Sequence, residues 1–360
     1  MNISERIKAF VELGEFLEQF SEAESLKKEN CLNDLFYEDF NVLLAKVSVE
    51  NLWFTPKHVR ASISGICHFL NQSNIEEWLK SYDTAGESTG IKVAVIMAGN
   101  IPMVGFHDMM CVLLCGHTFI GKLSSKDNQL LDFIAKLLIH INPEFEILIQ
   151  FNIGQLNNSI GFDALIATGS NNSARYFDAY FSRYPNIIRK NRNAVAVISG
   201  KESSEEIHAL GDDIFMYFGL GCRNVSKLYL PEGYDVKQLF EHWTGFAFAI
   251  DHSKYANNYE YQRSLLLMNK INHFDNGFLL LTENKDIASP VGVVYYEFYS
   301  ELNDIELKLK QDSDKIQCIV GTVLSKAIPF GKAQTPQLWE YADDVDTMHF
   351  LTKIKLDHDI

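Results

Sequence analysis

One cysteine stands among glycines, directly before a cation, in the stretch "YFGLGCRNVSKLYLP" at 217–231. The thiolate of Cys222 would be a nucleophile, and the neighbouring cation of Arg223 favours the thiolate over the thiol. Gly219 and Gly221 would let a substrate approach the backbone. A buried structural cysteine is the alternative that this stretch by itself leaves open.

Two strand ends upstream carry residue types that are favourable for phosphate binding. "MAGNIP" ends an apolar run at 91–98, and "ATGSNNSAR" ends another at 162–167. Ligands of α/β sheets bind at the carboxyl ends of the strands, often against a helix N-terminus. Thr168 offers a hydroxyl, Gly169 a close backbone approach and Ser170 a capping side chain. An ordinary helix cap is the alternative, and neither strand is followed by the usual dinucleotide fingerprint G-x-G-x-x-G.

Other candidate groups lie in a predicted helix and in a basic run. His107 and Asp108 could form an acid–base pair, but adjacent helical residues do not face each other. This favours a first-turn carboxylate beside an unrelated histidine. The run "RKNR" at 189–192 could meet phosphates or form a solvated surface. Cys111 and Cys115 would share a helix face without further ligands nearby, which indicates buried small residues rather than a metal site.

The length and composition of the chain define the class of scaffold that must position these groups. With 360 residues the chain exceeds one typical core, so two domains are expected. Hydrophobic residues at 47% and charged residues at 22% are typical of soluble globular proteins. The net charge of -15 argues against binding to nucleic acid or anionic membranes. No apolar run approaches the ~18 residues of a membrane span, and the scattered cysteines favour a reducing cytoplasm.

The order of the predicted elements indicates an α/β protein behind a helical N-terminal region. Apolar residues at helical spacing predict an amphipathic N-terminal helix, and Thr55 before Pro56 predicts a second helix start. From residue 91 on, apolar strands alternate with helices, which predicts parallel sheets covered on both faces. The expected strands are 91–98, 118–123, 146–151, 162–168, 193–199, 225–230, 277–282, 291–298 and 316–321. The expected helices among them are 103–116, 130–141, 172–181, 204–218, 236–248 and 259–270.

Taken in order, these motifs resemble those of the aldehyde dehydrogenase superfamily. "AGNIP" is similar to the segment with the oxyanion asparagine, here Asn100, and "GHTFIGKLSSKD" to the cofactor strand with its lysine, here Lys122. "ATGS" resembles the turn beneath the nicotinamide, "GLGCRNV" the nucleophile loop and "IPFGKAQTP" a late P-F-G segment. Five motifs in one order over residues 91–340 are more specific than any one of them.

A narrower resemblance is to the fatty acyl-CoA reductases of bacterial bioluminescence systems, the LuxC type. It is carried by "NIPMVGFHDMMCVLLCGHTFIGKLSSKD", "RKNRNAVAVI" and "YADDVDTMHFL", and it covers most of the chain after residue 85. In that family NADPH reduces an activated acyl group to an aldehyde through a cysteine thioester. The resemblance implies an acyl-CoA substrate, a cytoplasmic homo-oligomer and an acyl-transferase or acyl-protein synthetase as a partner.

Two departures from the wider superfamily bear on the reaction. Aldehyde-oxidising members carry a glutamate upstream of the cysteine that activates water, whereas "PNIIRKNRNAVAVISG" contains no acid. A reductase that works from acyl-CoA must avoid hydrolysis of its thioester, so the missing base fits this reaction. The stretch "SPVGVV" lacks the acid that usually holds the nicotinamide ribose in the superfamily. The residue that would contact this ribose here is therefore not identified.

The resemblance assigns each candidate residue a role. Cys222 would attack the acyl-CoA carbonyl, and the Asn100 side chain and the Cys222 backbone N–H would hold the oxyanion. NAD-preferring relatives have a glutamate three residues after the lysine; Ser125 stands there, with Lys126 next, which favours NADPH. The cofactor-binding candidates are Lys122, Ser124, Ser125, Thr168, Gly169 and Ser170, and no metal is expected.

The expected architecture is an aldehyde-dehydrogenase-like α/β fold with two doubly wound domains, a helical N-terminal region and an oligomerisation extension. Residues 1–85 would pack as helices on a cofactor-binding domain at 86–195, and 196–328 would form the catalytic domain. Residues 329–360 would return along the chain and could serve oligomerisation. A CoA-acylating aldehyde dehydrogenase and an acyl-phosphate reductase would use the same cysteine, and an inactive scaffold of an acyl-transfer complex is the alternative without catalysis.

Overall fold

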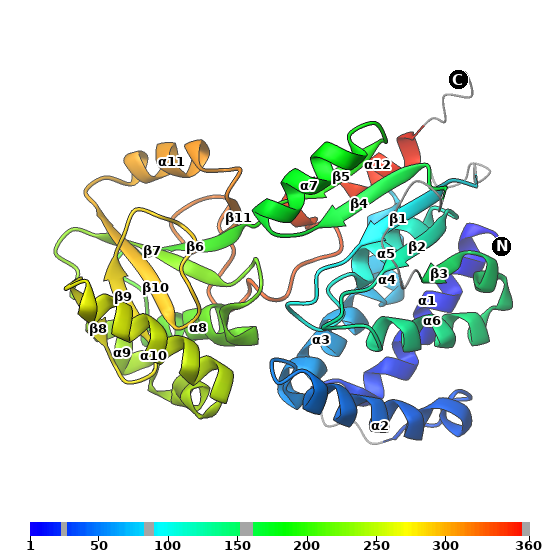
Figure 1. Ribbon diagram of the computed structural model, residues 1–360, viewed down its shortest axis with the longest axis horizontal. Coiled ribbons are helices and arrows are strands. Elements are labelled where there is room, and N and C mark those ends of the chain that lie inside the picture. The colour runs from blue at the N-terminus through cyan, green and yellow to red at the C-terminus, as the bar shows by residue number, and fades with distance from the viewer. Residues whose placement is uncertain (23–26, 83–89, 152–160, 355–360) are drawn as a thin grey trace. The chain divides into compact units, whose positions relative to one another are not determined.

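The computed structural model describes residues 1–22, 27–82, 90–151 and 161–354, so the loop expected after Tyr82 lies outside the described residues. The chain divides into two compact units (Figure 1). Unit 1 comprises residues 1–190 and 337–360, and unit 2 comprises residues 191–336. The divisions at 190/191 and 336/337 compare with 195/196 and 328/329 expected from the sequence.

In the described part of unit 1, the α-helices that precede the sheet are α1 Ile3–Leu17, α2 Asn33–Glu50, α3 Pro56–Phe69 and α4 Gln72–Leu79. The predicted apolar face of α1 is buried, with Phe10 and Leu13 fully inaccessible. The predicted start of α3 is confirmed, because the Thr55 side chain accepts from the His58 N–H and Pro56 occupies the first turn.

The sheet of unit 1 is parallel throughout the described residues. Its strands are β1 Lys92–Ile96, β2 Thr118–Lys122, β3 Ile149–Phe151, β4 Ala164–Thr168 and β5 Asn186–Arg189. They lie in the order β3-β2-β1-β4-β5, so the direction in which strands are added reverses between β1 and β4. The remaining helices of this unit are α5 Phe106–Leu114, α6 Leu130–Ile141, α7 Asn171–Phe181 and α12 Thr347–Lys353.

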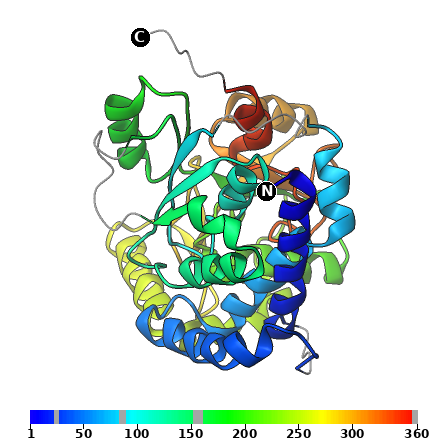
Figure 2. The same cartoon turned by 90° about the vertical axis from the view of Figure 1, so that its right-hand side faces the viewer.

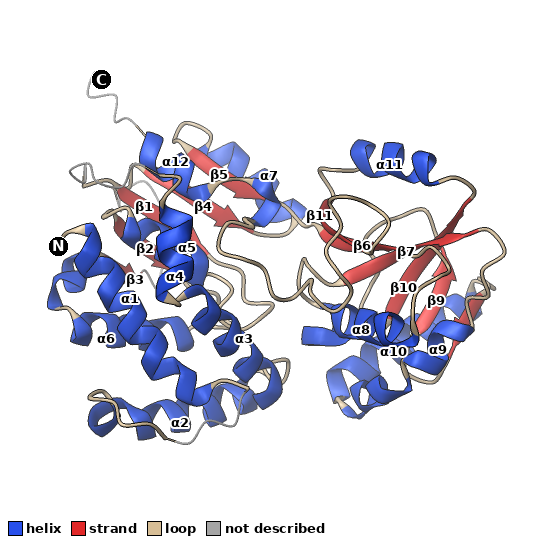
Figure 3. Ribbon diagram, turned by 180° about the vertical axis from the view of Figure 1, so that it is seen from behind, coloured by secondary structure: helices blue, strands red, loops and turns tan. Residues whose placement is uncertain are grey.

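Helices cover both faces of this sheet, as Figure 3 shows. Val93 and Val95 of β1 pack into the core formed with α1, α5 and α6, whereas Ala94 and Ile96 pack into a second cluster with Phe181 of α7. Successive residues of a strand point to opposite faces, so the apolar run of β1 serves two layers. The predicted doubly wound architecture is confirmed here.

Unit 2 contains a mixed sheet with the order β11-β6-β7-β10-β9-β8. Its strands are β6 Asn193–Val197, β7 Val225–Pro231, β8 His273–Asp275, β9 Leu280–Glu283, β10 Val293–Tyr299 and β11 Ile316–Val320. All neighbours are parallel except β8, which pairs antiparallel with β9. The helices of unit 2 are α8 Ser204–Phe215, α9 Gln238–His242, α10 Ser253–Met268 and α11 Leu302–Gln311.

Short 3-10 helices account for some of the differences from the expected elements. They are η1 Glu18–Phe20, η2 Pro143–Ile147, η4 Met216–Gly219, η5 Thr244–Asp251 and η6 Ala342–Asp344. The strand expected at 146–151 was wrong in its first residues, because Pro143 starts η2 instead. Strand β5 and helix α11 were not predicted; α11 has no side-chain cap at Glu301 to mark its start. Among the described residues no helix is long and apolar enough to cross a membrane.

Candidate functional site

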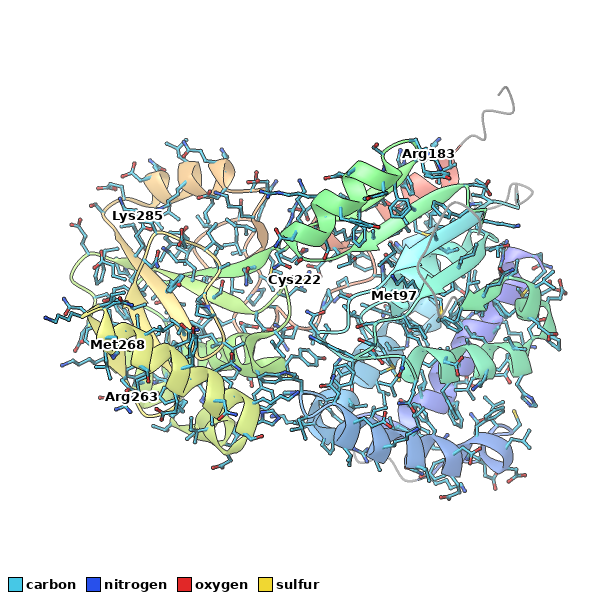
Figure 4. All side chains as sticks on the ribbon, in the orientation of Figure 1. Met97, Arg183, Cys222, Arg263, Met268 and Lys285 are labelled. Carbon is cyan, nitrogen blue, oxygen red and sulfur yellow. The ribbon has the colours of Figure 1, made fainter. Side chains whose placement is uncertain are left out.

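Cys222 lies in the turn that joins η4 to β7, and it is exposed (Figure 4). Immediately before this turn, Tyr217, Phe218 and Gly219 adopt left-handed conformations with φ of 51°, 55° and 77°. Residues other than glycine rarely adopt such φ angles, and each residue that does so costs about 1 kcal/mol or more. The backbone that leads to Cys222 is therefore strained, and neighbouring contacts must hold it.

Asn224 provides most of these contacts from inside the turn, and its side chain is buried. Its Nδ2 donates to the last carbonyl oxygens of α8 and the next turn, those of Asp213 at 3.0 Å, Ile214 at 3.3 Å and Met216 at 2.8 Å. Its Oδ1 accepts from the backbone N–H of Gly221 at 2.8 Å. One side chain thus caps the helix end and fixes the residue directly before Cys222.

The late P-F-G segment is tied to the same turn. The Asp213 carboxylate accepts from the backbone N–H groups of Gly331 at 2.6 Å and Ala333 at 2.9 Å. Burial raises the pKa of Asp213 to about 7. Arg223 Nε donates to the Ala333 carbonyl oxygen at 2.5 Å, so this arginine anchors the late segment. The idea that Arg223 also lowers the pKa of Cys222 stays a prediction.

In unit 1, the loop that carries Asn100 follows β1 and is held by neighbouring loops. The N–H of Met103, which has a φ of 55°, donates to Asp127 Oδ2 at 2.6 Å. Burial raises the pKa of Asp127 to about 6. Ser62 Oγ, on helix α3, donates to the Pro102 carbonyl oxygen at 2.6 Å. The Asn100 loop is thus connected both to helix α3 and to the segment after β2.

The loop after β2 packs directly on the Asn100 loop. A Cβ atom on Gly99 would lie 2.4 Å from Ser124 Oγ, so only glycine fits there. Ser124 Oγ accepts from the Lys126 N–H at 3.2 Å, which turns this hydroxyl toward its own loop. Ser125 and Lys126 are exposed, whereas Lys122 at the end of β2 is partly buried. Ser124 therefore forms part of a polar turn, and Ser125 is exposed to solvent.

The third strand end holds the Thr168–Ser170 turn. A Cβ atom on Gly169 would lie 2.8 Å from Ser173 Cβ, so glycine allows helix α7 to start close to the strand. Ser170 Oγ accepts from the Ser173 N–H at 3.2 Å, which makes Ser170 the N-cap of α7. The capping role considered from the sequence is thus present, and a cofactor contact at this turn stays a prediction.

The candidates of unit 1 lie on adjacent strand ends. Ile96 of β1 pairs with Lys122 of β2 on one side, and Ala167, directly before Thr168, also pairs with Ile96 on the other. Ligands of doubly wound sheets bind where the strand order reverses, which in this unit is between β1 and β4. The structure therefore groups the cofactor candidates and the Asn100 loop at the carboxyl edge of one sheet, and it places Cys222 in the other unit.

His107 and Asp108 have separate partners, as the helix geometry predicted. Asp108 forms a bidentate ion pair with Arg189, at 2.6 and 2.9 Å, and Arg189 also donates to Thr347 Oγ1 at 2.9 Å. His107 Nε2 lies 3.0 Å from the Leu338 carbonyl oxygen. Burial lowers the pKa of His107.

The prediction for the "RKNR" run was wrong for its first residue, Arg189. Arg189 is buried against Asp108, so it forms neither a solvated surface nor a phosphate contact. Arg192 donates to the carbonyl oxygens of Ser313 and Ile316, each at 3.2 Å, which fixes the chain before β11. Both arginines therefore have structural contacts that connect segments far apart in the sequence.

The six cysteines differ in burial. Cys31 and Cys222 are exposed, and Cys111 is buried as predicted, whereas Cys115 is partly buried. Burial raises the pKa of Cys115 to about 12, and that of Cys67 likewise to about 12. A thiol with so high a pKa is a poor nucleophile at neutral pH.

Three supporting residues were missed by sequence reasoning: Asp127, Asp213 and Asn224. Asn224 had a signal, because an Asn close behind a turn of glycines often bonds to the backbone of that turn. Asp127 and Asp213 had none, since nothing local distinguishes a buried carboxylate from a solvated one.

Similar solved structures define the fold. The Mycobacterium tuberculosis aldehyde dehydrogenase, solved in complex with NAD+, matches with a TM-score of 0.63 and 13% identity over 97% of this chain and 84% of that one. The P. syringae indole-3-acetaldehyde dehydrogenase AldA gives 0.64 and 13% over 91% and 74%. Aldehyde dehydrogenase 21 of Physcomitrella patens gives 0.61 and 14% over 86% and 71%. The protein thus has the aldehyde dehydrogenase fold, which confirms the predicted fold class.

The family is narrower than the fold. A family model of acyl-CoA reductases (LuxC) matches residues 50–243, which is more than half of the 360-residue chain. The protein belongs to this acyl-CoA reductase family, as its motifs predicted. A search of curated proteins finds no match.

Proposed function

We propose that this protein reduces a long-chain fatty acyl-CoA to the fatty aldehyde with NADPH, through a thioester on Cys222. The observation that carries the proposal is an exposed cysteine on a strained and firmly anchored turn, in a member of the acyl-CoA reductase family. Strain of this kind persists only where surrounding contacts maintain it, and it is frequent at active sites.

The covalent step requires a nucleophile and a donor for the developing negative charge. The Cys222 thiolate attacks the acyl carbonyl, a carbon–sulfur bond to Cys222 forms, and the bond to CoA breaks with CoA leaving as its thiolate. The Cys222 N–H and the Asn100 side chain donate to the oxyanion, a pair worth several kcal/mol in a site without water. Asn224 holds Gly221, and so keeps this N–H in a fixed direction.

The carboxyl edge of the unit 1 sheet is where a dinucleotide would bind, because the strand order reverses there. Gly99 and Gly169 flank this point, and their missing Cβ atoms let the segments of this edge pack closely on one another. Lys122, Thr168 and the exposed Ser125 would hold the cofactor there. When bound, a reduced nicotinamide supplies the hydride that the thioester needs. A neutral Ser125 beside Lys126 favours a 2′-phosphate, and hence NADPH.

The surroundings of the missing base also favour reduction over hydrolysis. The first acid after the acid-free stretch is Glu202, whose carboxylate accepts from the N–H groups of Ser199 at 2.6 Å and Gly200 at 2.9 Å. These bonds occupy the carboxylate in a turn. An enzyme that must deliver its thioester to a reductant benefits from having no base to activate water.

The proposal is tested by supplying purified protein with a long-chain acyl-CoA and following NADPH oxidation, CoA thiol release and aldehyde formation. Equal amounts of all three products are expected. Turnover with acyl phosphate but not acyl-CoA would instead indicate an acyl-phosphate reductase, and faster aldehyde oxidation with CoA would indicate the acylating dehydrogenase. Absence of both aldehyde formation and NADPH oxidation with every acyl donor would overturn the proposal in favour of a scaffold.

A further inference from the structure

Phe218, one of the left-handed residues before Cys222, packs against the start of helix α10. Its ring is buried and stacks on the imidazole of His252, with 4.3 Å between the ring centroids and 27° between the planes. The ring of Tyr255, in the first turn of α10, lies 5.8 Å from that of Phe218. Helix α10 is drawn in yellow-green in Figures 1 and 2. Its first residues therefore contact the strained backbone four residues before Cys222.

Both rings are themselves held by hydrogen bonds to the backbone. His252 Nδ1 accepts from the Tyr255 N–H at 3.3 Å, which makes His252 the N-cap of α10. Tyr255 is buried, and its hydroxyl donates to the Phe278 carbonyl oxygen at 2.9 Å. One edge of the imidazole thus meets α10 while its face covers Phe218. The capping bond therefore fixes the direction in which the imidazole faces Phe218.

Histidine is an unusual residue at a helix N-cap. Among the described α-helices, the other N-cap side chains that accept from a backbone N–H are Asn2, Thr55, Asn71, Ser170, Ser203 and Asp346. These short polar residue types are the preferred N-caps, because each provides an oxygen acceptor without a ring. Capping alone therefore does not explain the imidazole of His252. A planar ring is what the stack on Phe218 requires.

We infer that His252 is a positioning residue for the nucleophile: its ring, through Phe218, holds the left-handed backbone that presents Cys222. The inference rests on the proposed function for the role of Cys222, whereas the stack itself does not depend on that function. An aromatic pair and a left-handed residue other than glycine have energies of the same order. Loss of the ring should therefore lower the fraction of molecules that have the turn in place by about tenfold.

Three substitutions separate the ring of His252 from its cap. His252→Phe keeps a ring on Phe218 and loses the acceptor, His252→Asn keeps an acceptor for the Tyr255 N–H and loses the ring, and His252→Ala loses both. The first readout is the rate at which a long-chain acyl-CoA acylates Cys222 without cofactor, followed by intact mass. His252→Phe should retain most of the wild-type rate, and His252→Asn and His252→Ala should be about tenfold slower.

The free energy of unfolding distinguishes positioning from a merely structural role. His252→Phe and His252→Asn each lose one of two contacts, so urea unfolding should give similar stabilities for both. Their acylation rates should nevertheless differ about tenfold. A residue that acted only as a helix cap would give the reverse, with His252→Asn faster than His252→Phe. His208→Asn is the control, because it removes a histidine ring 5.2 Å from that of Phe246 in the same unit and should keep the wild-type rate.

Hydrogen exchange at the Gly221 N–H is a second readout that does not depend on the reaction. This N–H donates to Asn224 Oδ1, and the bond must open before exchange. Exchange should be about tenfold faster in His252→Asn and His252→Ala than in the wild type and His252→Phe. If this order holds while the wild type is not acylated, the proposed function is wrong and His252 still positions the turn.

Two results overturn the inference. One is equal exchange at the Gly221 N–H in the wild type and the three His252 variants. The other, in a wild type that is acylated, is a His252→Phe variant that acylates no faster than His252→Asn.

Discussion

The two loops proposed to act on the acyl carbonyl are fixed by different means. The Asn100 loop is held by its neighbours at the same sheet edge, through Met103 to Asp127 and through Pro102 to Ser62. The Cys222 turn is held from inside by Asn224 and from a segment about a hundred residues away by Asp213 and Arg223. A turn with two successive left-handed residues other than glycine requires more constraints than a loop with one.

A buried carboxylate supports each loop, but the two carboxylates differ in environment. Asp127 accepts one backbone N–H and has a pKa of about 6, and Asp213 accepts two and has a pKa of about 7. A second N–H bond should lower the pKa. Burial is the largest cause of the raised pKa of both carboxylates, and at Asp213 the neighbouring Asp212 carboxylate also raises the pKa.

The largest effect is expected from Asn224→Ala. The variant loses four hydrogen bonds and leaves buried backbone groups without their partner, which should lower the free energy of unfolding by about 4 kcal/mol. Urea unfolding monitored by fluorescence measures it. Asn269→Ala is the matched control, because this exposed side chain donates only to the Leu265 carbonyl oxygen, and its loss should cost under about 1 kcal/mol. Equal losses in both variants would show that Asn224 does not hold the turn.

The contribution of each buried carboxylate to the free energy of unfolding should level off at a different pH. Each folded-state pKa is raised above the ordinary aspartate value of 3.8. The protonated group therefore stabilises the fold below about pH 4, and this contribution is lost as the pH rises through the folded pKa. For Asp213 the loss continues to about pH 7, and for Asp127 only to about pH 6.

The measurement is the free energy of unfolding against pH for the wild type, Asp213→Asn and Asp127→Asn. The difference between wild type and Asp213→Asn should change by a few kcal/mol and level off near pH 7, with the Asp127→Asn difference smaller and level near pH 6. Difference curves that are flat, or that level off at one common pH, would contradict the distinction between the two supports.

Asn100→Ala tests the other loop. Loss of an oxyanion donor should lower kcat for acyl-CoA reduction by ~10² or more with little change in KM for NADPH. Asn128→Ala, an exposed asparagine after β2, is the control and should keep full activity. A loss confined to cofactor affinity would place Asn100 with the cofactor residues instead.

The smallest effect concerns the choice of cofactor. Ser125→Glu should weaken NADPH relative to NADH by about 1 to 2 kcal/mol, or tenfold or somewhat more, because a carboxylate repels the 2′-phosphate. Asn128→Glu adds the same charge three residues further along and should change the ratio less. A wild-type preference for NADH, or an unchanged ratio in Ser125→Glu, would remove Ser125 as the selector.

Local signals allowed much of the fold to be predicted. The expected helix at 130–141 coincides with α6, and the Thr55 cap with its following proline marks the start of α3. Apolar periodicity and caps depend on neighbours within one or two turns, so a sequence displays them directly. The strand ends that carry Lys122 and Thr168 followed from the same alternation of strands and helices.

The supports of the site depend on contacts that no local pattern displays. Asp213 meets Gly331, and Asp108 meets Arg189, only after the chain has folded. The sequence of a basic run is the same whether its arginine forms a buried ion pair or lies in solvent. For this reason the environment of Arg189 was predicted wrongly. The left-handed Tyr217 and Phe218 carry no glycine signal, since their angles are maintained by the surroundings rather than chosen by the residue.

The central claim is that Cys222 accepts the acyl group, and intact-mass spectrometry tests it most directly. Protein incubated with a long-chain acyl-CoA and no cofactor should gain the mass of one acyl group, and peptide mapping should locate it on Cys222. Cys222→Ser should stay unmodified while remaining folded, because the change is nearly isosteric. Cys31→Ser, which removes the other exposed cysteine, should be acylated like the wild type. Acylation of the Cys222→Ser variant, or an acyl group mapped to a different residue of the wild type, would contradict the claim.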